Sequence, residues 1–356
     1  MKLWFFINIH LTNERYLSTF ILFGTASRCH STALLALCGT AYNQLTFEAI
    51  RLDPFFAASI FAFGLIFGSF LNVCIYRLPR EKSIVFPGSA CPGCGHPIRW
   101  YDNVPVLSWL VLRGRCRDCK ERISPRYAVV ELVIGFLFLA CYYEFGLGVA
   151  TAKYCVLCFL LVGLIFTDAE TKLLPDALTL PGLGLGLLFS LFVPVNDIIT
   201  EYFPNLWQFR SDSWRCHSLA DAVLGAFVGA FFIFASGFAY KLVRGVEGMG
   251  FGDVKLMAMI GSFLGLRLTL LTILSASLLG ALFGLTTIPA VWIKRSRRRM
   301  MRGHEPASVA IPRAWHSAKN VYRYYAMPFG VFLGSMALIG AFFGGNLYRW
   351  YLNRYL

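Results

Sequence analysis

Long stretches of apolar residues limit how this chain can fold. A helix that crosses a hydrocarbon core of about 30 Å needs roughly 20 mainly apolar residues. Only 15% of the residues are charged and 57% are hydrophobic, which excludes an ordinary soluble domain. We therefore predict an all-α, polytopic membrane bundle of about eight transmembrane helices. The predicted segments are 54–76, 127–146, 149–168, 176–194, 219–241, 251–265, 267–293 and 327–345. The sixth is short, and its glycines at 261 and 265 predict a tilted or interrupted helix.

Lys and Arg are concentrated in two loops, which sets the predicted orientation. Residues 77–126 hold ten Lys or Arg and four acids, and residues 294–325 hold nine and one. Cytoplasmic loops carry such an excess, so both loops are expected in the cytoplasm with six crossings between them. The two loops account for the formal net charge of +14. The basic composition thus reflects topology and contact with anionic membrane lipid, and we expect no nucleic-acid partner.

The chain divides into four predicted regions. Residues 1–50 are an N-terminal extension without the features of a signal peptide, for which a ninth helix and a wrongly assigned start both stay open. Residues 51–126 carry the first helix and a cysteine-rich loop, and residues 127–293 form the membrane core. Residues 294–356 add the basic loop and the last helix.

The cysteine-rich loop contains two C-x-x-C pairs separated by 21 residues. The four cysteines are Cys91, Cys94, Cys116 and Cys119. In a reducing compartment this pattern predicts structural zinc, because four thiolates complete a tetrahedral site and leave no position for a catalytic water. Two disulfides are the alternative, which the cytoplasmic assignment disfavours, and His96 is a spare donor. A third pair, Cys155 and Cys158, lies inside a membrane helix and is assigned to core packing.

Several small or polar residues of the first two helices invite a role. Gly64 and Gly68 stand four residues apart, a spacing that lets another helix approach closely. Asn72 needs a partner in lipid, so it either bonds across helices or lines a site. For Glu131, a paired acid near a helix end and a residue lining a polar cavity are equally open readings.

Two acids at the ends of apolar segments form the candidate catalytic site. Asp168 ends the third predicted helix, and Asp253 follows a turn that contains Gly248, Gly250 and Gly252. The predicted topology puts both acids at the cytoplasmic side. Taken singly, Asp253 could cap a helix, and Asp168 could pair with a lysine one turn later.

The glycines favour a substrate site over a cap, since a cap needs only one such residue. Three glycines leave bare main chain with which a substrate strand can pair. Two facing carboxyl groups share one proton, so one can activate water while the other polarises a peptide carbonyl. This is the chemistry of an aspartic peptidase. Lys255 should point away from Asp253, so a topology or lipid anchor precedes a site role.

These motifs together resemble the type IV prepilin peptidases, bacterial inner-membrane aspartic peptidases of the GxGD class. The matching pieces run from residue 64 to about 265. They are Gly68-Ser69-Phe70-Leu71-Asn72-Val73, Tyr76-Arg77-Leu78-Pro79, the doubled C-x-x-C, Ser108-Trp109-Leu110, Arg113-Gly114-Arg115-Cys116, Arg126-Tyr127 with Glu131, Asp168 with Leu174-Pro175-Asp176, and Gly250-Phe251-Gly252-Asp253-Val254-Lys255-Leu256.

The resemblance implies removal of the basic leader from prepilins or type II secretion pseudopilins at the cytoplasmic face. It also implies methylation of the new N-terminus with S-adenosylmethionine, a function tied to the family's cysteine-bearing N-terminal domain. The catalytic residues carried over are Asp168 and Asp253. The residues assigned to substrate binding or site shaping are Gly248, Gly250, Gly252, Lys255, Glu131 and Asn72. No residue pattern marks a methyl-donor site, so methylation rests on the resemblance alone.

Two alternatives remain. The first is a GxGD peptidase without methyltransferase activity. The second is a proton-coupled transporter, which predicts acids at mid-membrane depth and inverted repeats with broken helices. The sequence shows no internal repeat, and both acids lie at one edge of the predicted bundle.

Overall fold

A computed structural model describes residues 53–195, Asp197, and residues 213–245, 250–303, 306–324 and 328–355. The predicted extension 1–50 and Gly248 lie outside the described residues. Contacts divide the chain into the units Met1–Asp53 and Pro54–Leu356, and the fold described below is that of the second unit.

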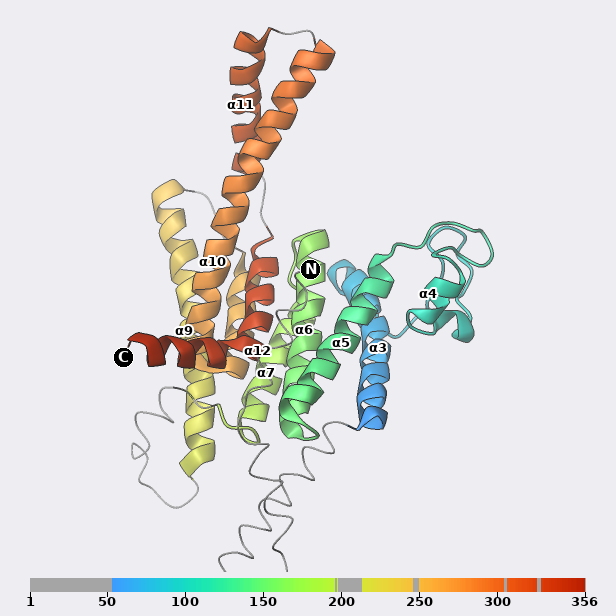
Figure 1. Cartoon of the computed structure of the whole chain (residues 1–356), viewed down its shortest axis with the longest axis vertical. Helices are drawn as coiled ribbons and strands as arrows, with labels where there is room; N and C mark the ends of the chain where they lie inside the picture. Colours follow the sequence, from blue (N-terminus) through green and yellow to red (C-terminus); the bar gives the residue numbers. More distant parts are fainter. Residues whose placement is uncertain are drawn as a thin grey trace, which may run out of the picture. The chain divides into compact units, whose positions relative to one another are not determined.

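The second unit is built from helices, as predicted (Figure 1). Across the described ranges there is no β-strand, and the loop between α3 and α5 contains two isolated β-bridges. The helices are α3 (Pro54–Arg77), η1 (Leu78–Arg80), η2 (Trp100–Asn103), α4 (Leu107–Val111), α5 (Arg126–Phe145), α6 (Val149–Thr171), α7 (Asp176–Ser190), α9 (Ser213–Arg244), α10 (Phe251–Gly303), α11 (Ala307–Tyr324) and α12 (Phe329–Tyr355).

Every predicted apolar segment contains a helix, but the number of crossings is smaller by the criterion of length. Among the described residues, five helices are long and apolar enough to cross a membrane: α3 with η1, α5, α6, α9 and α10. Helix α7 has 15 residues and ends at Ser190, short of the predicted end at 194. At 1.5 Å per residue it measures about 22 Å, less than a hydrocarbon core. The count of eight transmembrane helices therefore stays a prediction.

Helix α10 turns back on itself, which confirms the predicted interruption. Gly265 lies inside it with a φ of 78° and a non-helical backbone. A Cβ added at Gly229 of α9 would lie 2.7 Å from Thr269 Cγ2 and 3.0 Å from the Met257 carbonyl oxygen. In one continuous helix those two residues would be about 18 Å apart. The two arms of α10 are therefore antiparallel, so Asp253 and the basic end of α10 lie on the same side of the bundle.

Two buried clusters hold the helices together, and α6 contributes to both. One cluster joins α6 to α7, α9, α10 and α12, and the other joins α6 to α3 and α5. The predicted close approach at Gly64 and Gly68 is confirmed: a Cβ at Gly68 would lie 2.6 Å from the Cα of Glu131, and one at Gly64 would lie 2.8 Å from the Cα of Gly135. Helix α6 is thus the central helix of the fold, and Asp168 lies at its end.

Candidate active site

Asp168 lies in the last turn of α6 and is 5% exposed. Its Oδ2 accepts a hydrogen bond of 3.0 Å from the backbone N–H of Val331, at the start of α12. The approach depends on Gly330, because a Cβ there would lie 2.9 Å from the same oxygen. Lys172 ends the helix in a left-handed conformation, and its backbone N–H donates to the Asp168 carbonyl at 2.9 Å.

Asp253 is the third residue of α10 and is 9% exposed. A residue that caps a helix precedes the first helical residue, so this position does not fit the capping alternative. A Cβ at Gly252 would lie 3.0 Å from the Cβ of Leu174, so this glycine is needed for packing. Among the described residues, the nearest atom that a Cβ at Gly250 would meet is the Gly252 nitrogen at 3.9 Å. On the side facing the described residues, Gly250 therefore leaves open space beside its main chain.

Leu174 joins the two acid-bearing segments. It follows α6 in the chain, packs on Gly252 beside Asp253, and its Cδ1 lies 3.3 Å from the Cβ position of Gly330 beside Asp168. The two carboxyl groups are close enough to interact electrostatically. The sequence pattern singled out both acids, but the contribution of α12 was missed because Val331 is 163 residues from Asp168 along the chain.

Lys255 contacts an acid that the sequence interpretation treated separately. Its Nζ lies 2.7 Å from both carboxylate oxygens of Asp176, the first residue of α7. Lys255 Nζ also lies 5.3 Å from the centroid of the Phe251 ring. The predicted role of this lysine as a topology or lipid anchor stays a prediction. The ion pair with Asp176 ties the start of α10 to the segment that follows Asp168.

Glu131 connects α5 to the cysteine-rich loop, and Asn72 connects α3 to α5. The Glu131 Oε2 accepts a 2.7 Å hydrogen bond from the backbone N–H of Val106, just before α4. Asn72 Nδ2 donates to the Tyr127 carbonyl at 2.9 Å. Their described hydrogen-bond partners lie here and not at the acid pair. A neighbouring ion pair between Arg126 and Glu170 connects the start of α5 to the end of α6.

The four cysteines converge. Their Sγ atoms all lie within 4.8 Å of one another, and those of Cys91 and Cys119 are 3.8 Å apart. Tetrahedral zinc with Zn–S bonds of about 2.3 Å requires sulfur separations of about 3.8 Å, so the donor set fits the ion. All four are free of disulfides, which opposes the disulfide alternative.

Each cysteine pair forms the same small turn. The backbone N–H of Gly95 donates to the Cys91 carbonyl at 2.9 Å, and that of Lys120 donates to the Cys116 carbonyl at 3.1 Å. Gly95 and Lys120, each one residue after the second cysteine of its pair, both have positive φ. Two equivalent turns thus present four thiols to one point.

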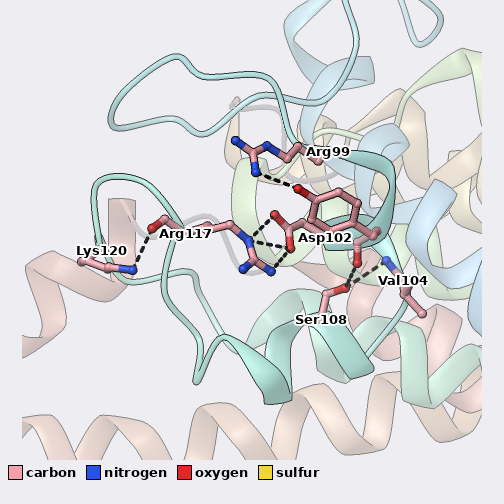
Figure 2. A network of polar contacts seen from close by, with 7 residues as sticks. Arg99, Asp102, Val104, Ser108, Arg117 and Lys120 are labelled. Carbon is pink, nitrogen blue, oxygen red and sulfur yellow. Dashed lines mark hydrogen bonds and ion pairs between the residues drawn. The ribbon is translucent and has the colours of Figure 1, made fainter.

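A polar network braces this subdomain (Figure 2). The Arg117 guanidinium binds both carboxylate oxygens of Asp102, with Nε 2.8 Å from Oδ2 and Nη2 2.5 Å from Oδ1. This hydrogen bonding holds the pKa of Asp102 below its usual range. Ser108 donates to the Tyr101 carbonyl at 3.0 Å. The network fastens the segment between the cysteine pairs to the second pair.

The cavity beside the cysteines does not fit S-adenosylmethionine. It has a volume of about 280 Å³ and is lined by Leu112, Arg113, Arg115, Cys116 and Lys120. A methyl donor with a sulfonium cation is repelled by three cationic side chains, and no carboxylate lines this cavity to offset them.

Sequence comparisons agree with this architecture. Residues 62–145 match the model for the bacterial peptidase A24 N-terminal domain, and residues 155–285 match the model for the type IV leader peptidase family. A prepilin leader peptidase/N-methyltransferase of Aeromonas hydrophila is 36% identical over 321 residues, covering 83% of this chain and 94% of the relative. The chain belongs to the type IV leader peptidase family. Another relative of that name, from Myxococcus xanthus, is 40% identical over 261 residues, covering 73% of this chain and 71% of the relative.

A third family member, from Klebsiella pneumoniae and with the same name, is 40% identical over 244 residues, covering 65% of this chain and 98% of the relative. No solved structure matches the chain. The first domain model ends with α5 and covers the cysteine-rich loop, and the second begins inside α6 and covers both candidate aspartates.

Proposed function

We propose that this chain is a membrane aspartic endopeptidase that removes the basic leader from type IV prepilins or type II secretion pseudopilins. The observation that carries the proposal is the meeting of two buried acids, Asp168 and Asp253, at the ends of α6 and α10. Membership of the type IV leader peptidase family and the names of the relatives support it.

The pair divides the chemistry between two carboxyl groups. In the proposed mechanism the two facing carboxyl groups share one proton. The ionised group removes a proton from a water molecule as the water oxygen attacks the scissile carbonyl carbon, and the protonated group donates its hydrogen bond to the carbonyl oxygen. The resulting tetrahedral adduct collapses as the C–N bond breaks and the leaving nitrogen takes a proton from the pair. The Val331 N–H fixes the Asp168 carboxylate during this exchange.

The open side of Gly250 suits an extended substrate. With respect to the described residues, its main chain has free space where a side chain would otherwise stand, and Phe251 next to it is exposed. An extended peptide can pair with such main chain. The apolar helix of the substrate then lies in the bilayer against the bundle, with the leader junction at the acid pair.

We further propose that the new N-terminus is methylated and that S-adenosylmethionine supplies the methyl group. The names of the relatives support this step. The four cysteines would hold structural zinc. Inner-membrane location with the acid pair on the cytoplasmic side is supported by the Lys and Arg excess of the two loops.

Replacement of either aspartate tests the peptidase. Purified Asp168→Asn and Asp253→Asn variants should lose cleavage of a prepilin peptide, because an amide can neither share the proton nor activate water. Glu170→Gln is the matched control, since Glu170 lies on the same helix end but pairs with Arg126. Cleavage by the Asp168→Asn variant at the wild-type rate would exclude the pair mechanism.

The same assay with S-adenosylmethionine tests methylation. The mass of the cleaved product should increase by one methyl group only when the donor is present. If active peptidase never yields a product with this added mass, the protein is a peptidase without methyltransferase activity.

A further inference from the structure

Helix α4 lies at a depth that is unexpected for part of a cytoplasmic loop. Val106, directly before it, donates its N–H to Glu131, which is five residues, or about 8 Å, inside α5. Glu131 packs against Gly68, nine residues before the end of α3 at Arg77, which is about 14 Å along that helix. The start of α4 is therefore level with apolar turns of α3 and α5 (Figure 1).

The outer side chains of α4 are apolar. Leu107, Leu110 and Val111 are 60%, 57% and 76% exposed, and their spacing places them along one side of the short helix. At the depth of the α3 and α5 spans, the medium outside the protein is acyl chain rather than water. Exposure of three large apolar residues at this place is then favourable.

Backbone groups at lipid depth must find partners within the protein. The donors around α4 do so, with acceptors that include the Glu131 carboxylate, the Ser108 hydroxyl and nearby carbonyl oxygens. The residues whose N–H groups are satisfied in this way are Val104, Val106, Leu107, Ser108, Leu110, Leu112, Arg113 and Gly114. This explains why a buried acid stands at position 131.

Cations lie above the apolar side. Gly114 accepts a 2.8 Å hydrogen bond from the N–H of Ile123, three residues before α5 begins, so the chain has returned to the level of the helix end. Arg113, Arg115 and Lys120 line the 280 Å³ cavity at this level. The order from inside to outside is thus an apolar surface and then a cationic cavity, which matches the acyl chains and the phosphate of a phospholipid.

We infer that α4 is embedded in the membrane interface and that the adjoining cavity binds the headgroup phosphate of an anionic phospholipid. The inference concerns lipid binding and does not depend on the proposed peptidase activity. Each Lys or Arg near an anionic surface contributes about a fivefold gain in binding. Loss of Arg113 and Arg115 should therefore weaken binding by about 25-fold.

Lipid binding to the full chain in detergent tests the cavity. Native mass spectrometry with phosphatidylglycerol and phosphatidylcholine should show at least a tenfold preference for the anionic lipid. The R113Q/R115Q variant should lose this preference, and R113K/R115K should keep it. The R99Q/R122Q variant removes the same charge from exposed positions of the same loop that do not line the cavity and should keep the preference for the anionic lipid. Equal losses in R113Q/R115Q and R99Q/R122Q, or no preference in the wild type, would overturn the site.

Photocrosslinking in nanodiscs of the two lipids tests the depth of α4. A benzophenone amino acid at Val111 should form lipid adducts, as it should at Phe227, an exposed apolar residue of the α9 span. The same label at Asp118, in the second cysteine turn, should form none. A Val111 label that reacts like Asp118, or that links to a second protein molecule, would overturn the inference. Peptide cleavage by the same samples separates this result from a failure of the proposed function.

Discussion

Gly330→Ala is the sharpest test of the site, because it changes neither aspartate. The added Cβ would lie 2.9 Å from Oδ2 of Asp168, 3.2 Å from its Cγ and 3.3 Å from Leu174 Cδ1. Relief to an ordinary contact of 3.4 Å requires α12 and α6 to separate by about 0.5 Å. The Val331 N–H to Oδ2 distance would then rise from 3.0 Å to about 3.5 Å, where such a hydrogen bond is largely lost.

The size of the effect follows from that hydrogen bond. A hydrogen bond to a charged group is worth about 1.5–3 kcal/mol, and each 1.36 kcal/mol of barrier corresponds to a factor of about ten in rate. We therefore expect kcat for prepilin peptide cleavage to fall by about 10- to 150-fold. KM should change little, because the substrate contacts proposed at Gly250 are untouched.

Gly340→Ala is the matched control on the same helix. Among the described residues, the nearest atom to a Cβ there is Thr272 Oγ1 at 3.6 Å, an ordinary contact. Gly340 lies in the interior of α12, where alanine gains about 1 kcal/mol of helix propensity, and Gly330 in the first turn gains no more than that. A loss of activity at Gly330 alone therefore reports the local contact. Circular dichroism and thermal unfolding in detergent check the fold. A folded Gly330→Ala variant that keeps more than half of the wild-type kcat would refute the role given to α12.

Three further changes test separate contacts. Lys255→Met should lower peptidase activity but cost only about 0.2–1 kcal/mol of stability, because the Lys255 and Asp176 side chains are 25% and 56% exposed. The double exchange Lys255→Asp with Asp176→Lys should restore activity. If it does not, the ion pair itself is not what activity requires. Removal of metal by a chelator, or Cys116→Ser, should make the loop between α3 and α5 sensitive to protease while the bundle keeps its helical signal; metal analysis that finds no zinc would contradict this. Glu131→Gln should increase amide exchange at Val106, and unchanged exchange there would count against the bond between loop and bundle.

Features encoded over short distances in the chain could be predicted from sequence. The glycine spacing at Gly64 and Gly68 predicts close helix packing, and the structure puts both against α5. The interruption near Gly265 follows from a glycine in an apolar segment. The converging cysteines follow from two C-x-x-C pairs, whose turns are fixed by local hydrogen bonds. In each case the residues that determine the structure are neighbours in the sequence.

Contacts between distant helices could not be predicted. In lipid every outer surface is apolar, so hydrophobic periodicity does not reveal which helices are neighbours. The approach of Gly330 to Asp168 and the pairing of Lys255 with Asp176 therefore had no sequence signal. The same limit applies to Glu131, for which the sequence left two readings open. Its acceptance of a hydrogen bond from Val106 depends on how the loop folds back.

The depth of the acid pair distinguishes a peptidase site from a transporter site. Asp168 is 19 residues from the start of α6 at Val149, or about 28 Å, which is nearly a full hydrocarbon thickness. Transporter sites lie near the midplane, whereas an acid at this depth is within reach of interfacial water, the co-substrate of hydrolysis.

The first arm of α10, from Phe251 to Gly265, is too short for a full crossing. Asp253 is level with Asp168 through Leu174, yet it lies only 12 residues, or about 18 Å, from Gly265. The turn at Gly265 must therefore sit about 10 Å inside the level at which α6 begins. Backbone groups exposed by a turn at that depth need partners within the protein. Buried Asp197 supplies one, accepting the Arg267 N–H at 3.0 Å and pairing with its Nε at 3.3 Å.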